Sequence, residues 1–338
     1  MKENGKKLKY FLFDSLLWTY AAISLYKIVY QNYLLQVRYL EYHTQDFIFC
    51  LITGVVLSLT FSFIPKSSIF RGFSQKSNTP YFKRTYFLLF LFILIITFIN
   101  GIHFSQISLR EFLSASGMNG AKRIFWSLLQ PNFDILGESL KAAVETIFMA
   151  FMATALAIPF SFILSFFAAK NLTRGSFIFR AVYTGARFAL NGTRSIEPLV
   201  WAIIFSVWVG IGPFAGMLAL CLHSVASLSK LYSEQIENIN EGPLDAIRST
   251  GAHPIQVIWF GVVPQIILPF LSFTIYRWDI NVRMATVIGL VGGGGIGTML
   301  MQYQGTARWN EVGLLIIIIA LIVWAMDTMS SKIREKIK

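Results

Sequence analysis

The stretch VGLLIIIIALIVWAM, residues 312–326, contains four consecutive isoleucines and no charged side chain. A second stretch, YFLLFLFILIITFINGIHF at 86–104, is equally free of charge. Each approaches the roughly 20 apolar residues that cross the hydrocarbon core of a bilayer as a helix. Of all 338 residues, 55% are hydrophobic and 14% are charged, which leaves too little polar surface for a soluble globule. The sequence therefore predicts an all-α, polytopic membrane protein.

Six further apolar stretches bring the predicted number of membrane spans to seven or eight. They cover residues 11–30, 47–65, 146–169, 199–212, 214–231 and 261–278. The first is interrupted by Asp14 and Lys27, so a helix lying in the membrane interface is the alternative there.

Four clusters of basic residues predict the orientation of these spans. They lie at 2–9, 66–84, 170–194 and 332–338, between or outside the apolar stretches. Basic residues in short loops mark the cytoplasmic side, and eight spans place all four clusters there together with both termini. The net charge of +12 then mostly reflects basic residues on the cytoplasmic side of a protein of the cell (inner) membrane. A nucleic-acid interface would need these charges on one folded face, so that partner is excluded.

The sequence contains no pattern for chemistry on the chain itself. There is no G-x-x-x-x-G-K-[ST] phosphate loop, and the four histidines lack the i,i+4 spacing of a zinc helix. Cys50 and Cys221 both fall within apolar stretches. We therefore predict no catalytic residue, no metal and no cofactor on this chain; any ATP would be bound by another subunit.

The most informative polar segment is YSEQIENINEGPLDAIRSTGAHPIQVIWFGVVPQ, residues 232–265. Pro243 suits the first position of a short helix, Asp245 its first turn, and Gly251 the residue after its end. Pro254 suits the start of a second helix. Two capped helices with mixed charge predict a docking surface for another protein. A solvated connector is the alternative.

Part of this segment resembles the coupling motif of ABC importer permeases, which reads E-A-A, three residues, Gly, nine residues, I-x-L-P. The matching positions are Asp245, Ala246, Ile247, Gly251, Gly261, Val263 and Pro264. Aspartate stands where the motif has glutamate, and isoleucine stands where it has the second alanine. Glycine and valine replace the I and the L of I-x-L-P. The stretches RSIEPLVWAIIFSVWVGIGPFAGMLALCLHS (194–224) and YRWDINVRMATVIGLVGGGGIG (276–297) resemble the phosphonate-type permeases of the same superfamily.

The resemblance implies a type I ABC importer permease core over residues 86–338, with a cytoplasmic coupling loop at 233–260. Residues 1–85 would be an extension with one or two extra spans. The residues implied to couple the chain to an ATPase are Asp245, Ala246, Ile247, Gly251 and Pro264. The implied partners are a second permease copy, two ATPase subunits that hold ATP and Mg²⁺, an extracytoplasmic binding protein and membrane lipid. The solute would be an oxyanion such as phosphonate, phosphite or phosphate.

A glycine cluster lies between the last two predicted spans, in TVIGLVGGGGIGTML at 286–300. Three of its glycines satisfy G-x-G-x-x-G, but a dinucleotide fold needs an acid roughly 20 residues downstream, where this chain has Ile317. We predict instead a re-entrant or gate segment at 286–301 on the outer side. Its glycines are Gly292, Gly293, Gly294, Gly295 and Gly297. A glycine-rich packing face without gating is the alternative.

Ionisable residues flank the predicted span at 261–278. Asp279 and Arg283 are spaced i,i+4 and could neutralise each other, which leaves Arg277 for an anionic solute. Both roles, structural pair and solute contact, stay open for the two arginines. Glu197 is likewise placed to pair with Arg194 at i,i+3.

Two other classes of protein compete with the importer. A secondary transporter for a small anion would need no ATPase docking surface, so the coupling-like loop discriminates against it. An intramembrane enzyme could use only His223 and Ser224, whose adjacency in sequence directs them to different faces of a helix.

Overall fold

The computed structural model describes residues 2–26, 44–63, 85–105, 107–173 and 177–337, and regular structure in these ranges is helical. The chain separates into two compact units, Met1–Met118 and Asn119–Lys338, each of which is described by itself. Helix α6 (Ala115–Leu128) runs across the boundary between them. The predicted all-α class is confirmed.

In its described ranges the first unit contains α1 (Lys2–Leu25), α2 (Thr44–Phe63), α4 (Thr85–Phe104) and the short α5 (Leu109–Phe112). Helix α1 packs against both α2 and α4. A Cβ on Gly54 would overlap Thr19, so the backbones of α1 and α2 touch there. Helix α4 thus packs with α1 in this unit.

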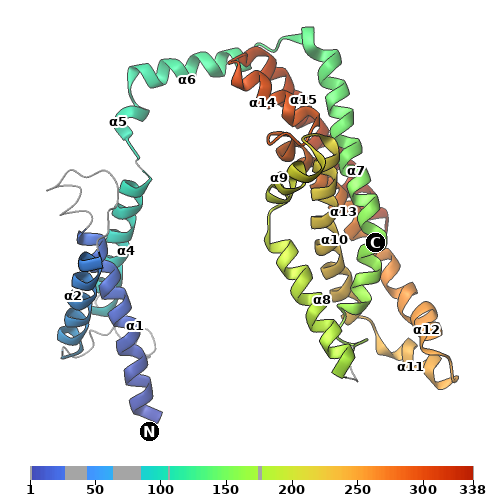
Figure 1. The fold of residues 1–338 in the computed structure, drawn as a ribbon, viewed down its shortest axis with the longest axis horizontal. Helices are drawn as coiled ribbons and strands as arrows, with labels where there is room; N and C mark the ends of the chain where they lie inside the picture. Colours follow the sequence, from blue (N-terminus) through green and yellow to red (C-terminus); the bar gives the residue numbers. More distant parts are fainter. Residues whose placement is uncertain (1, 27–43, 64–84, 106, 174–176, 338) are drawn as a thin grey trace. The chain divides into compact units, whose positions relative to one another are not determined.

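The second unit is a helical bundle centred on α7, α10 and α13 (Figure 1). Its elements are η3 (Phe133–Ile135), α7 (Leu136–Phe167), α8 (Phe177–Ser195), α9 (Pro198–Val209), α10 (Pro213–Glu237), α11 (Glu241–Ser249), α12 (Pro254–Val257), η4 (Ile258–Val262), α13 (Val263–Gly289), α14 (Gly295–Gly305) and α15 (Trp309–Ile337). Ala150, Ala153, Ala219 and Ala285 are fully buried in the shared core. Such small side chains let membrane helices approach closely.

The apolar helices of both units match the predicted spans. Among the described residues, four helical segments are long and apolar enough to cross a membrane: Phe133–Phe167, Pro213–Glu237, Pro254–Gly289 and Trp309–Ile337. Four shorter apolar helices cover Phe11–Leu25, Gln45–Thr60, Phe87–Ile102 and Pro198–Val209. Together these eight elements coincide with the eight apolar stretches of the sequence.

Helix α8 corrects one sequence prediction. Residues 170–194 were expected to form a cytoplasmic loop, yet most of them belong to α8, which packs along α10. Five polar residues of α8 recur at alternating spacings of four and three: Arg180, Thr184, Arg187, Asn191 and Arg194. This spacing places them in one stripe of an amphipathic helix. Mean hydropathy over a window therefore does not identify α8, because the polar stripe lowers the average that the apolar face would give.

Two predicted spans also end too early. Helix α10 continues past the predicted limit at 231 to Glu237, and Tyr232 and Ile236 are buried. The soluble segment therefore begins later than residue 232. Helix α13 continues past 278 to Gly289, so the charged residues expected at the end of that span lie inside the helix.

Candidate functional site

The coupling segment, defined here as residues 240–262, contains α11, α12 and η4. The Asn240 side chain caps α11 by accepting a hydrogen bond from the Gly242 amide at 3.0 Å. The helix thus begins at Glu241, two residues before the predicted Pro243, and Glu241 rather than Asp245 is the acid of its first turn. Gly251 follows the end of α11 with a φ of +77°, as the sequence predicted.

The second helix begins at Pro254, as predicted. His253 and Gln256 form a reciprocal cap in front of it: the Gln256 side chain accepts from the His253 amide at 2.8 Å, and the His253 ring accepts from the Ile255 amide at 3.4 Å. Both short helices are therefore held by caps of their own residues.

Helix α11 has two different faces. Leu244 is buried, and a Cβ on Gly261 would lie 3.4 Å from it and 3.3 Å from Ile247, so α11 packs tightly on η4. Asp245 and Ala246 are exposed on the other face. Asp245 pairs there with Arg248 at 3.1 Å. The motif residues thus divide into Ile247, which packs inward, and Asp245 and Ala246, which are free to meet a partner.

Pro264 marks an irregular turn between the coupling segment and α13. Because proline has no amide hydrogen, it cannot make the ordinary i to i−4 bond. The preceding turn, η4, is a π-helix in which the Val263 amide donates to the Ile258 carbonyl. Pro264 therefore acts through the backbone geometry of this turn.

Gln265 fastens the start of α11 to α13. Its side-chain oxygen accepts from the Asn240 amide at 3.0 Å, and its nitrogen donates to the carbonyls of Asn240 at 3.3 Å and Gly261 at 2.8 Å. Nothing in the sequence pointed to this residue, since its partner lies 25 positions away. Gln265 therefore connects the start of α11 directly to α13.

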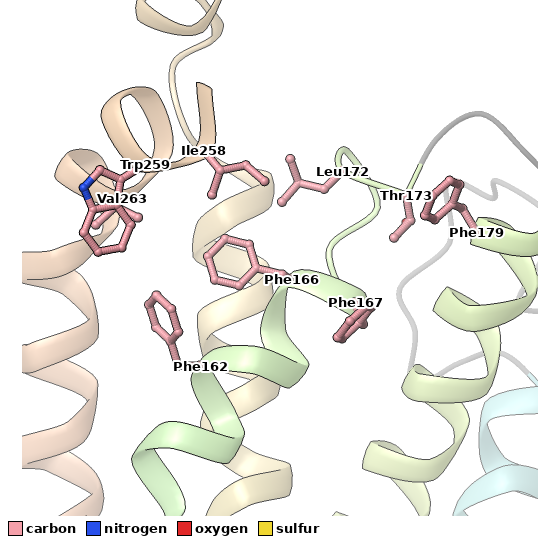
Figure 2. A pocket seen from close by; sticks show the side chains of 9 residues that line it. All are labelled: Phe162, Phe166, Phe167, Leu172, Thr173, Phe179, Ile258, Trp259 and Val263. Atoms are coloured by element: carbon pink, nitrogen blue, oxygen red, sulfur yellow. The ribbon is translucent and has the colours of Figure 1, made fainter. Parts of the chain in front are cut away.

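An apolar pocket of about 280 Å³ lies beside the coupling segment (Figure 2). Figure 2 shows Phe162 and Phe166 of α7 facing Ile258 and Trp259 of η4. The lining residues are Phe162, Phe166, Phe167, Leu172, Thr173, Phe179, Ile258, Trp259 and Val263. None of them is charged, so this pocket lacks the groups that hold an oxyanion.

The glycine loop, residues 290–294, joins α13 to α14 and is packed closely within the chain. φ is +89° at Gly292, +82° at Gly294 and +67° at Gly295. A Cβ on Gly294 would lie 2.5 Å from Pro213 Cγ, and one on Gly297 would overlap the Thr286 carbonyl. The predicted segment 286–301 is therefore the end of α13, a tight turn and the first half of a short helix.

Two residues of α7 cap the start of α14. The Glu145 carboxylate accepts from the Gly295 amide at 3.2 Å, and the Thr146 hydroxyl accepts from the Ile296 amide at 2.9 Å. A negative side chain is favourable at the positive end of a helix dipole. The sequence showed only an acid at the start of a span, because the two partners lie 150 residues apart.

The charges of α13 form two separate groups. The expected pair is present: Arg283 contacts Asp279 at 2.7 Å, and Asp279 is 2% exposed. Arg283 also contacts Asp327 of α15 at 2.5 Å, a partner that the sequence did not indicate. Arg283 is thus neutralised by two carboxylates and connects α13 with α15.

Arg277 belongs to a different, buried cluster of neutral polar groups. Its Nε donates to the Ser224 hydroxyl of α10 at 3.1 Å. The Asn281 amide donates at 2.8 Å both to Ser224 and to Thr154 of α7. Three helices therefore contribute to this cluster, and none of its hydrogen bonds involves a carboxylate.

Glu197 lies at the start of α9 without a capping hydrogen bond from its side chain. Among the ion pairs of the described residues there is none between Glu197 and Arg194, so the predicted i,i+3 pair is not formed. The reason is the break between α8 and α9, since the i,i+3 relation holds only within a continuous helix.

An apolar bundle, a capped segment outside it and a packed glycine loop define a membrane-embedded subunit of a transport system. The chain belongs to the family of binding-protein-dependent transport system inner membrane components, which matches residues 135–333. It is a permease subunit of an ATP-driven importer in the cell membrane, and ATP hydrolysis belongs to a separate subunit.

Relatives agree with this assignment, and a solved structure shares the fold. The phosphite transport system permease protein PtxC of Stutzerimonas stutzeri is 35% identical over 66% of this chain and 80% of its own length. The phosphate-import permease protein PhnE of Mycolicibacterium smegmatis is 34% identical over 63% of this chain and 40% of its own length. A structure of the MetNI methionine ABC transporter shares the fold, with a TM-score of 0.52 and 20% identity over 61% of this chain and 99% of that one.

Proposed function

We propose that this chain forms the membrane pathway for a phosphorus oxyanion, of the phosphonate, phosphite or phosphate class, delivered by an extracytoplasmic binding protein. Relatives that are 34–40% identical are named for the transport of phosphite, phosphate or phosphonate. The interior of the bundle agrees with an anionic solute, since Arg277 is buried without a carboxylate partner among the described residues.

The two-faced helix α11 is the observation that carries the mechanism. Its inner face packs on η4, while Asp245 and Ala246 are exposed on its outer face. In the proposed mechanism an ATPase subunit binds this outer face. Closure of two ATPase subunits around ATP then moves α11, and Gln265 passes the movement to α13. Gly251 and Pro264 set the two ends of the moving part.

The glycine loop is proposed as the outer gate. It terminates α13, so a displacement that begins at α11 reaches Gly292–Gly295 through one continuous helix. Its glycines allow backbone to pack on backbone, as at Gly294 against Pro213. Gly293 and Gly297 are buried in the same contact region. A change in this packing would open or close the pathway at that end.

The assembly that completes this function contains a second copy of the permease and two ATPase subunits that hold ATP and Mg²⁺. Both termini are proposed to be cytoplasmic, on the same side as the coupling segment. Asp279 and Arg283 are assigned to holding α13 against α15, through the ion pair with Asp327. Glu197 is assigned to the start of α9.

The test is reconstitution of the chain in proteoliposomes with its ATPase and binding protein. Uptake of radiolabelled phosphate should require ATP on the side of the membrane that carries the ATPase. Unlabelled phosphite or methylphosphonate should compete with this uptake. Sulfate serves as the control competitor. Uptake that proceeds without ATP and follows an ion gradient would replace this proposal by the secondary transporter.

A further inference from the structure

Arg277 is an unusually placed cation. It is 7% exposed, its only hydrogen bond is the one to Ser224, and a second guanidinium nitrogen, Nη2, is buried without a partner. No carboxylate of the described residues lies within ion-pair distance of it. A buried charge without a counter-charge is costly in a protein interior and more so in a membrane. Such a cation is suited to a negative ligand that is present only part of the time.

Arg283, on the same helix as Arg277, does have carboxylate partners. Asp279 and Asp327 both pair with Arg283, at 2.7 and 2.5 Å. Asp279 stands two positions from Arg277 and therefore points to another side of α13. The two arginines thus have opposite surroundings: one is neutralised twice, and the other is left with hydroxyl and amide groups.

The groups around Arg277 can hold an oxyanion. Ser224 and Asn281 offer a hydroxyl and an amide. His223, next to Ser224 on α10, also has a ring nitrogen, Nδ1, that is buried without a partner. The cluster therefore contains two buried nitrogens without partners, one on Arg277 and one on His223.

We propose that Arg277 and His223, together with Ser224 and Asn281, form a transient binding site for the PO₃ group of the solute inside the bundle. This inference rests on the proposed function. A guanidinium holds two oxygens of a tetrahedral oxyanion side by side, and hydroxyl or amide donors hold the third. Phosphonate, phosphite and phosphate share the PO₃ group, so the site would bind all three solutes through it.

The test measures binding of inorganic phosphate to the permease–ATPase complex in nanodiscs, without the binding protein. The readout is ³¹P line broadening as phosphate is titrated, with chloride at equal ionic strength as the control. We expect saturable binding by the wild type and at least tenfold weaker binding by Arg277→Gln. Arg277→Lys should restore part of the loss, and His223→Gln should weaken binding by a smaller factor.

Arg283→Gln is the matched control. It removes a cation from the same helix but leaves the Arg277 cluster intact, so phosphate binding should not change. Equal binding by wild type and Arg277→Gln, or no saturable binding by the wild type, overturns the site. If Arg277→Gln does not fold, the comparison of wild type with Arg277→Lys and His223→Gln decides. Uptake without ATP would overturn the proposed function alone, because the binding assay contains no nucleotide.

Discussion

Gly251 and Gly294 have almost the same positive φ in opposite surroundings. φ is +77° at Gly251, after α11, and +82° at Gly294, before α14. A Cβ on Gly251 would meet nothing within 4 Å, whereas one on Gly294 would lie 2.5 Å from Pro213 Cγ. The two glycines stand beyond opposite ends of the continuous segment Pro254–Gly289. One end of this segment is therefore open to a partner, and the other is closed by the chain's own packing.

The difference teaches what each end requires. At the coupling segment the chain makes its own caps and leaves the outer face of α11 empty, so a defect there should appear only when a partner binds. At the glycine loop the backbone packs closely against the chain's own residues, so a defect should appear in the permease itself. Four substitutions test this contrast, in order of expected effect.

Gly294→Leu should have the largest effect and abolish uptake. The side chain adds strain of about 1–3 kcal/mol, because φ of +82° with ψ of −177° is a region adopted almost only by glycine. Overpacking against Pro213 adds about 1–3 kcal/mol. Thermal melting of the purified permease should fall, and uptake in proteoliposomes should be lost. Gly305→Leu is the control, because a Cβ there meets nothing within 4 Å and no positive φ is involved. Normal uptake by Gly294→Leu would remove the gate assignment.

Ala246→Glu should release the ATPase while the permease alone melts as the wild type does. The side chain is exposed in the isolated chain, so it disturbs no internal packing. In a groove that fits alanine, the added volume and charge should reduce ATPase co-purification by at least about tenfold. Ala246→Ser keeps the size and should retain the ATPase. Should Ala246→Glu still couple ATP hydrolysis to uptake, the docking face lies elsewhere.

Gln265→Ala should leave the ATPase bound but weaken its coupling to transport. The three hydrogen bonds between Gln265 and the backbone of Asn240 and Gly261 would be lost. A loss of about 1 kcal/mol in the α11–α13 connection corresponds to roughly fivefold more ATP hydrolysed for each solute imported. Gln265→Glu keeps the acceptor for the Asn240 amide, so its ratio of ATP hydrolysed to solute imported should lie between those of the wild type and Gln265→Ala. An unchanged ratio of ATP to solute would show that the movement takes another route.

Gly251→Val should have the smallest effect, because there is space for the side chain and only the positive φ opposes it. We expect about 1–2 kcal/mol of local strain, and less for Gly251→Asn, since asparagine tolerates this conformation better than a β-branched residue. ATPase co-purification at limiting ATPase concentration measures the difference. Equal loss by both variants would show that Gly251 itself contacts the partner.

Much of the fold could be predicted because membrane spans are a local property of sequence. The eight apolar stretches, the two capped helices around Gly251 and the i,i+4 pair of Asp279 and Arg283 all depend on neighbours within a few residues. Helix α8 was missed for the opposite reason: its signal is a periodicity, which an average over a window removes.

The contacts that join the site together could not be predicted in this way. Gln265 meets Asn240 across 25 positions, Arg283 meets Asp327 across 44, and Gly295 meets Glu145 across 150. No spacing rule connects such residues, because only the packing of the bundle brings them together. Nor could the sequence predict that Arg277 lacks a carboxylate partner among the described residues, because this depends on how the neighbouring helices pack and orient their acidic side chains.

The capping of α14 by α7 bears on how the polypeptide is inserted during its synthesis. An 11-residue helix is about 16 Å long, well short of the roughly 30 Å hydrocarbon layer. Amide groups in a membrane interior have no water as acceptor, and those of Gly295 and Ile296 find acceptors on Glu145 and Thr146. Because the ribosome delivers α7 long before α14, the receiving surface is in place when the later segment emerges. The order of synthesis thus matches the order in which these helices depend on one another.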